Sequence, residues 1–204
     1  MKITVEGLGK RFNREWIFKN LTDTFESGNT YAIVGPNGSG KSTLLQVLWG
    51  QMPSSTGKIT YTSQKEIPLE DIFQSIAIAT PYMDLIDEFT GLEMVNFHFQ
   101  FKKARENKTP KEILECLELS HASTKRLSNF SSGMRQRMKL GLAFYSEVPI
   151  LFFDEPSTNL DKKSIQWYYQ ELAKLPSESL AFIASNQEHE YPATAKKINI
   201  LDHK

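Results

Sequence analysis

Gly35-Pro36-Asn37-Gly38-Ser39-Gly40-Lys41-Ser42-Thr43 is the stretch that decides the fold of this chain of 204 residues. It matches the phosphate-loop pattern G-x-x-x-x-G-K-[ST] at every defined position. The apolar run 31–34 precedes it and a helical pattern over 41–49 follows it, so the loop joins a buried strand to a helix. Its glycines let backbone N–H groups turn inward around phosphates. All nine residues are therefore candidate contacts of a nucleotide.

Two side chains of this stretch have a specific expected chemistry. Lys41 is expected to reach the β- and γ-phosphates, and the Ser42 hydroxyl to coordinate Mg²⁺. A Gly/Ser-rich turn without function is the alternative, but the full pattern between a strand and a helix argues against it.

A second motif closes another apolar strand, predicted over 149–153. Asp154 and Glu155 follow it directly and should lie at the carboxyl edge of a parallel sheet, where α/β proteins bind ligands. We expect Asp154 to hold Mg²⁺, usually through water, and Glu155 to orient or deprotonate an attacking water. Alone, the pair could be a solvated strand end; together with a phosphate loop, it predicts ATP hydrolysis.

The remaining pattern predicts the fold class. A short exposed strand is expected at 3–5, further strands at 59–61, 76–79, 180–184 and 198–201, and helices around 138–145 and 165–172. The polar sequence from 91 to 119, which has a helical pattern, interrupts the alternation of strands and helices. We expect one domain over 1–204, an α/β P-loop NTPase core with a mainly parallel sheet. A small antiparallel β subdomain and a helical subdomain inserted at about 83–135 should complete it.

Composition excludes some functions. Lys+Arg and Asp+Glu both count 24, which argues against a protein that mainly grips nucleic acid, so no nucleic-acid partner is expected. No stretch approaches the ~20 apolar residues that span a bilayer, and the N-terminus lacks a signal-peptide core. We expect a soluble protein, so that transport would require a separate membrane chain. The single cysteine, Cys116, fits a reducing compartment.

A third motif precedes the helix near residue 138: Phe130-Ser131-Ser132-Gly133-Met134-Arg135-Gln136-Arg137. By itself it could be a serine N-cap and a turn. Following a phosphate loop and preceding an Asp-Glu strand, it makes the chain resemble the ATP-binding subunits of ABC transporters, from about Ile3 to Leu201. Their signature reads Leu-Ser-Gly-Gly-Gln, then a basic residue, Gln and Arg. Ser131, Gly133, Gln136 and Arg137 match, whereas Phe130, Ser132 and Met134 differ.

The resemblance implies roles for several positions. The signature segment, Ser131, Ser132, Gly133 and Met134, would contact the γ-phosphate of ATP bound by a partner subunit. Phe12 would stack on adenine, although it could also be an edge of the core, and Trp16 is a nearby competitor. Ser157-Thr158-Asn159-Leu160-Asp161 is similar to the family's D-loop, which crosses to the second subunit. Asp161 could equally cap the next helix, or do both.

Two positions depart from the family pattern. Tyr82 stands where the family has a Gln that contacts the metal and the attacking water, and Asn186 stands where it has a catalytic His. His189, three residues further on, is better explained as an exposed loop residue. An amide keeps only a neutral donor where imidazole can become cationic. We therefore expect slow rather than absent hydrolysis.

The resemblance implies a Mg²⁺-dependent ATP hydrolase that serves as the ATP-binding subunit of an ABC transporter. Two copies, or this chain and a related one, would close head to tail around two ATP molecules and drive a membrane-spanning permease subunit. The chain would be cytoplasmic, held at the inner face of the membrane by that partner. The alternative is a soluble ABC-type ATPase in DNA repair, translation or cofactor assembly, but the coiled coils or duplicated cassettes usual there are not found. A P-loop kinase or GTPase would leave the signature segment unexplained.

Overall fold

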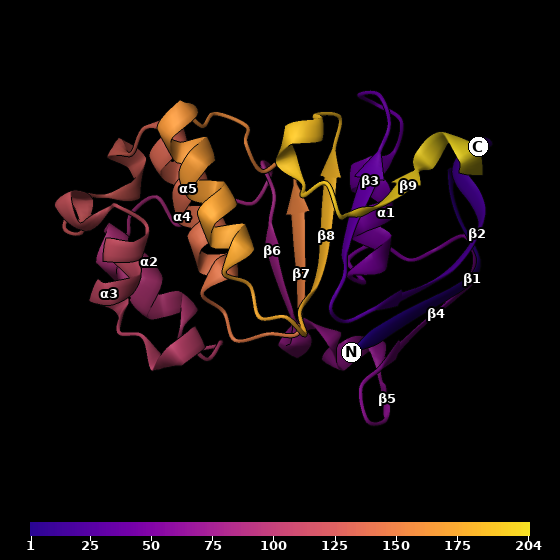
Figure 1. Cartoon of the computed structure of the whole chain (residues 1–204), viewed down its shortest axis with the longest axis horizontal. Coiled ribbons are helices and arrows are strands. Elements are labelled where there is room, and N and C mark those ends of the chain that lie inside the picture. Colours follow the sequence, from indigo (N-terminus) through magenta and orange to yellow (C-terminus); the bar gives the residue numbers. More distant parts are fainter. The chain divides into compact units, whose positions relative to one another are not determined.

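The computed structural model describes residues 1–204, which form two compact units (Figure 1). The first unit comprises residues 1–76, 148–155 and 176–204. The second comprises residues 77–147 and 156–175. None of the helices combines the length and the apolar character that crossing a bilayer requires.

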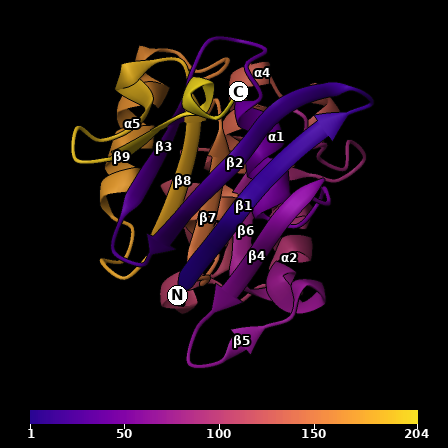
Figure 2. The same ribbon diagram turned by 90° about the vertical axis from the view of Figure 1, so that its right-hand side faces the viewer.

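The first unit contains an antiparallel sheet of four strands in the order β2-β1-β4-β5. Its strands are β1 (Lys2–Phe12), β2 (Glu15–Glu26), β4 (Thr56–Thr62) and β5 (Glu66–Ile67). Figure 2 shows β2, β1 and β4 running side by side. The short exposed strand predicted at 3–5 is wrong in extent and exposure, because β1 lies between two strands and buries Ile3 and Val5 completely.

A parallel sheet forms the rest of this unit, with the order β7-β8-β3-β9. The strands are β3 (Thr30–Val34), β7 (Ile150–Asp154), β8 (Leu180–Ser185) and β9 (Lys196–Asn199). Helix α1 (Lys41–Leu48) lies between the two sheets. The Tyr61 hydroxyl of β4 donates to Leu48 O at 2.9 Å, and the Trp49 ring packs 5.6 Å from that of Phe152. The predicted α/β class with parallel and antiparallel sheets is confirmed.

The strand predicted at 198–201 is also partly wrong. The run 198–201 was expected to be extended, but β9 ends at Asn199 and a 3₁₀ helix, η6 (Ile200–His203), follows. The Asn199 side chain accepts a hydrogen bond from Leu201 N at 3.2 Å and so begins a turn that apolar content alone does not reveal. Two further 3₁₀ helices of this unit are η1 (Leu69–Ser75) and η5 (Glu188–Glu190).

The second unit is mainly helical. Strand β6 (Ile76–Ala79), whose first residue belongs to the first unit, leads into α2 (Gly91–His98), α3 (Pro110–Cys116) and α4 (Ser132–Phe144). Helix α5 (Lys162–Ala173) follows after β7. Short 3₁₀ turns connect them: η2 (Arg105–Asn107), η3 (Ser120–Ala122) and η4 (Leu127–Asn129). Thr90 with Glu93, and Thr109 with Glu112, form capping boxes that explain where α2 and α3 begin.

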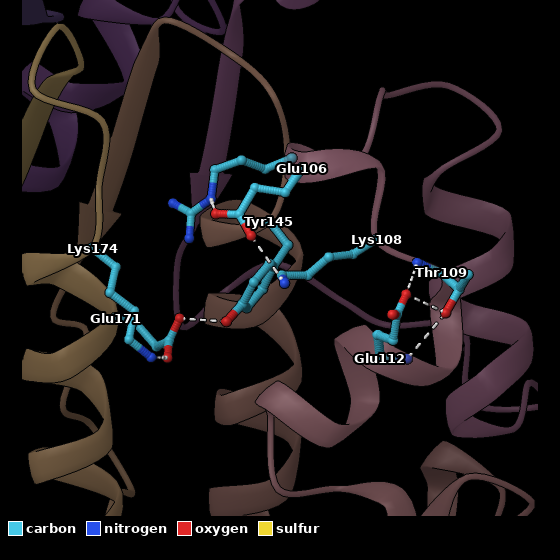
Figure 3. Close-up of polar contacts among 8 residues, drawn as sticks. Glu106, Lys108, Thr109, Glu112, Tyr145, Glu171 and Lys174 are labelled. Carbon is cyan, nitrogen blue, oxygen red and sulfur yellow. Dashed lines mark hydrogen bonds and ion pairs between the residues drawn. The ribbon is translucent and has the colours of Figure 1, made fainter.

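A polar cluster joins α4, α5 and the η2 turn inside this unit (Figure 3). The Tyr145 hydroxyl, just after α4, donates to Glu171 Oε2 on α5 at 2.6 Å, and Lys174 pairs with Glu171 at 2.7 Å. Arg105 N donates to Tyr145 O at 2.7 Å, and its guanidinium lies 5.2 Å from the Tyr145 ring centre. Burial is the largest cause that raises the pKa of Tyr145, so the phenol stays a donor.

Candidate nucleotide-binding site

Three segments meet at the carboxyl edge of the parallel sheet. Val34 is paired with Ser185, and Asp154 with Ala184, in parallel register. The phosphate loop 35–43, Glu155 and Asn186 each follow one of these strands. The structure therefore brings together the three groups of residues that the sequence placed at strand ends.

The phosphate loop needs glycine at two positions where other chain segments approach it. Gly40 has φ 106°, and a Cβ there would lie 2.3 Å from the Ile17 Cγ2 atom of β2. Gly35 has φ 152°, and its Cβ would lie 2.7 Å from Ile200 Cγ2. Side chains other than hydrogen would displace these neighbours, so the glycines fix how closely the loop packs on β2 and η6.

Lys41 points into its own loop. The residue is 4% exposed, and its Nζ donates to Gly35 O at 3.0 Å and to Pro36 O at 3.1 Å. These carbonyls are neutral acceptors, whereas phosphate oxygens carry charge and accept shorter, stronger hydrogen bonds from an ammonium. The ammonium is thus held where an anion could replace the carbonyls.

Asp154 is a buried carboxylate whose environment suits a cation. It is 2% exposed, and its Oδ1 atom has no hydrogen-bond partner. Burial raises the pKa of Asp154 most, and the Glu155 charge raises it further, while a hydrogen bond with Ser42 and the Lys41 charge lower it. A buried carboxylate oxygen without a partner is costly unless a ligand satisfies it. The Ser42–Asp154 pair therefore fits Mg²⁺, a hard cation that prefers oxygen ligands.

Glu155 has a strained backbone. Its φ is 43°, in the left-handed region, and its N–H donates to Ala184 O at 2.9 Å. This conformation costs a residue with a side chain about 1–2 kcal/mol. The hydrogen bond to β8 holds the residue there, just beyond the last residue of β7.

Asn186 is tied directly to the phosphate loop. Its Nδ2 donates to Asn37 Oδ1 at 2.9 Å. A cavity of about 270 Å³ opens beside them, with Gly35, Pro36 and Lys197 in its wall. His189 lies exposed in η5, as expected of a loop residue.

Strand register separates the two aromatic candidates for stacking on a base. Phe12 is paired with Glu15, and the neighbouring Arg11 with Trp16, so Phe12 and Trp16 lie on opposite faces of the hairpin. Trp16 occupies the alternate face, where Arg11 lies 5.7 Å from its ring centre. Phe12 is also 46% exposed. At most one of the two rings can therefore face the phosphate loop, and the exposed Phe12 ring is free to stack on a base.

The signature segment and the D-loop-like segment both lie in the second unit and contact each other. Ser131 is the N-cap of α4, and its Oγ accepts from Met134 N at 3.2 Å. A Cβ at Gly133 would lie 3.0 Å from Asn159 O. Gln136 Nε2 donates to Pro156 O at 3.0 Å in a buried position. These contacts hold the signature segment and the D-loop-like segment together within this unit.

Asp161 caps a helix, as one of the two interpretations of the sequence held. Its Oδ1 accepts from Ser164 N at 2.8 Å, and this hydrogen bond is the first cause that holds the pKa of Asp161 below its usual value. Tyr82, also in the second unit, is 80% exposed. Lys139 of α4 donates to the preceding carbonyl, Pro81 O, at 2.7 Å.

Sequence reasoning missed two lysines that hold these segments. Lys139 of α4 is buried, which is unusual for a lysine. Lys204 Nζ donates to Ser39 O at 2.7 Å. Neither belongs to a motif, and a lysine whose partner is a backbone carbonyl leaves no pattern in the sequence.

Comparison with known proteins gives the relationship of the chain. The family model described as ABC transporter matches residues 18–158, more than half of the chain. A Bacillus subtilis protein named as an uncharacterized ABC transporter ATP-binding protein is 27% identical over 191 residues, covering 92% of this chain and 86% of that protein. The sulfate/thiosulfate import ATP-binding protein of Thermosynechococcus vestitus is 30% identical over 201 residues, covering 92% of this chain and 58% of that protein.

Solved structures agree in fold. A Pyrococcus furiosus protein provisionally named as an ABC transporter ATP-binding protein superposes with a TM-score of 0.81 at 20% identity, covering 100% of this chain and 99% of that one. The chain spans 59% and 66% of the length of two further Bacillus subtilis relatives. The chain belongs to the ABC transporter family, as one of its ATP-binding ATPases.

Proposed function

We propose that this chain binds Mg·ATP at the carboxyl edge of its parallel sheet and couples ATP hydrolysis to a membrane-spanning permease subunit. The observation that carries the proposal is the buried, partnerless Asp154 Oδ1 beside Ser42 and Lys41, in a site that has a phosphate loop.

The residues divide the chemistry among them. Lys41 and the loop N–H groups bind the phosphates, and Phe12 stacks on adenine. Ser42 and Asp154 hold Mg²⁺, which neutralises phosphate charge when bound. Glu155 orients or deprotonates the attacking water, and Asn186 offers an amide donor to the γ-phosphate.

Two such chains, or this chain and a related one, would form the working dimer. The signature segment 131–134 of one protomer caps the ATP of the other, where the N-terminus of the 13-residue helix α4 favours an anion. Asp161, besides capping α5, crosses to the partner. The helical subdomain at about 83–135 and the exposed Tyr82 face the permease at the inner side of the membrane.

Two variants test this proposal at separate steps. Lys41→Ala should abolish ATP binding in a fluorescence titration, because the main phosphate cation is removed. Glu155→Gln should keep ATP binding but stop hydrolysis, and so trap an ATP-bound dimer that elutes at doubled mass in size-exclusion chromatography. Unchanged affinity in the first variant, or unchanged turnover in the second, would contradict the assigned role. Co-purification with a multi-span membrane protein separates a transporter subunit from a soluble ABC-type ATPase.

A further inference from the structure

The segment after β9 lies against the phosphate loop. Asn199 of β9 is paired in parallel with Val34 of β3, so the two chains leave the sheet side by side. The η6 turn follows, and its Ile200 is fully buried against Gly35. The Asn199 side chain accepts from Leu201 N and donates to Asp202 Oδ1 at 3.1 Å, which fixes the turn.

Lys204 extends from this turn to the middle of the loop. Its Nζ donates to Ser39 O at 2.7 Å, and Ser39 is 6% exposed. The chain has no cis peptide bonds, and in a trans peptide the C=O and the next N–H point in opposite directions. A cation that holds Ser39 O therefore turns the Gly40 N–H away from Lys204. No backbone carbonyl accepts from that N–H.

We propose that Lys204 is a positioning residue of the phosphate loop, which orients the Ser39–Gly40 peptide so that its N–H is available to a phosphate oxygen. Pulling electron density toward Ser39 O also polarises the peptide and makes that N–H a better donor. This inference rests on the proposed ATP site and adds a residue that would not itself touch the nucleotide. Its charge adds to that of Lys41, which holds two other carbonyls of the same loop.

The test compares lysine variants for ATP affinity and turnover. Lys204→Met removes the donor, and we expect the Kd for Mg·ATP and the KM to rise about 3- to 10-fold, the size expected for one partly exposed charge-assisted hydrogen bond. The kcat at saturating ATP should change less than about twofold, because the reacting groups are untouched. Lys204→Arg keeps a cationic donor and should restore most of the affinity. Lys65→Met, an exposed lysine in the β4–β5 turn, is the matched control and should bind ATP as the parent does.

The melting temperature of each variant is also measured without nucleotide. A purely structural role of Lys204 would lower the melting temperature of Lys204→Met but leave its ratio of KM to kcat unchanged. Parental ATP affinity in Lys204→Met, or an equal loss in Lys204→Arg, would overturn the inference. Lys41→Ala in the same titration keeps the two proposals apart. If Lys41→Ala binds ATP normally, the proposed site is wrong. If Lys41→Ala does not bind ATP and Lys204→Met binds it with parental affinity, only the role of Lys204 is wrong.

Discussion

Asn186 Nδ2 donates a hydrogen bond of 2.9 Å to Asn37 Oδ1, and so joins the end of β8 to the phosphate loop across 149 residues of chain. The family resemblance places a histidine at position 186. The amide at this position reaches the loop itself, so it organises the site even where it does not meet the γ-phosphate. It cannot become cationic as an imidazole can.

Replacing Asn186 by histidine should raise turnover. We expect Asn186→His to increase steady-state phosphate release about 3- to 10-fold with little change in ATP affinity, because an imidazole adds a γ-phosphate contact that acts in the transition state. Asn37→Ala is the control, since it breaks the same hydrogen bond without adding an imidazole and should give no increase. A rate of phosphate release equal to or below that of the parent would show that the lack of a histidine at position 186 does not limit turnover.

Tyr82→Gln should add to that gain. Tyr82 is 80% exposed, and a phenol is bulkier than the carboxamide that the family places there. We expect the double variant Asn186→His/Tyr82→Gln to hydrolyse ATP faster than Asn186→His alone, measured by phosphate release at saturating Mg·ATP. A slower double variant would mean that the site has adapted to tyrosine.

Glu155 should show a conflict between stability and activity. Glu155→Gly relieves the left-handed backbone at φ 43° and should raise the free energy of unfolding by about 0.5–1 kcal/mol, after the extra chain entropy of glycine is counted. Hydrolysis should be lost. Glu155→Gln, which keeps the side-chain size, should lose hydrolysis without the gain in stability. Urea denaturation of both variants measures the difference; equal stabilities would show that the strain is absent.

The cluster in Figure 3 predicts a cost for one hydroxyl. Tyr145→Phe removes the donor to Glu171, a residue that is 1% exposed, and leaves a buried carboxylate oxygen less satisfied. We expect a loss of about 2 kcal/mol in the free energy of unfolding. Tyr82→Phe removes a hydroxyl from an exposed tyrosine and should change the urea midpoint very little. A similar midpoint for both variants would contradict the prediction.

His98 predicts a pH dependence of stability. Its pKa is lowered to about 4 from 6.5, first by burial and then by Lys102 nearby, while its Nε2 lies 2.9 Å from Ser146 Oγ. The unfolded chain therefore takes up the proton first as pH falls. The contribution of neutral His98 is present above pH 6.5 and is lost between about 6.5 and 4, on the order of 3 kcal/mol.

His98→Leu should flatten that slope in urea titrations between pH 7 and 4.5. The control His121→Leu changes an exposed histidine of the same unit and should leave the slope of stability against pH unchanged. An unchanged slope in His98→Leu would assign the acid sensitivity to other groups.

Local patterns were enough for the elements that carry the site. Helix α1 follows the phosphate loop, β7 ends at Asp154, and β8 ends just before Asn186, because buried parallel strands are continuous apolar runs and their ends are marked by polar residues. The order of the three motifs then determined the family. Parallel pairing brings strand ends to one edge, so even the meeting of these residues followed from the sequence.

Strand β2 is an element that local sequence patterns do not predict. Its buried residues Phe18, Leu21 and Phe25 are spaced three and four apart, as on a helix. The strand departs from regular alternation because Asn20 has φ 57° and its pairing with β1 shifts register. A bulge depends on the neighbouring strand, which no local window contains.

The sequence by itself determined which chemistry the chain carries, since the phosphate loop, the Asp-Glu pair and the signature segment are each written in consecutive residues. Only the tertiary structure decided which face Phe12 takes, that Asn186 holds Asn37, and that Lys204 reaches Ser39. Hydrogen bonds across 149 and 165 residues depend on where the sheet places two loops. That placement is fixed by the packing of the whole unit, not by the residues that form the bonds.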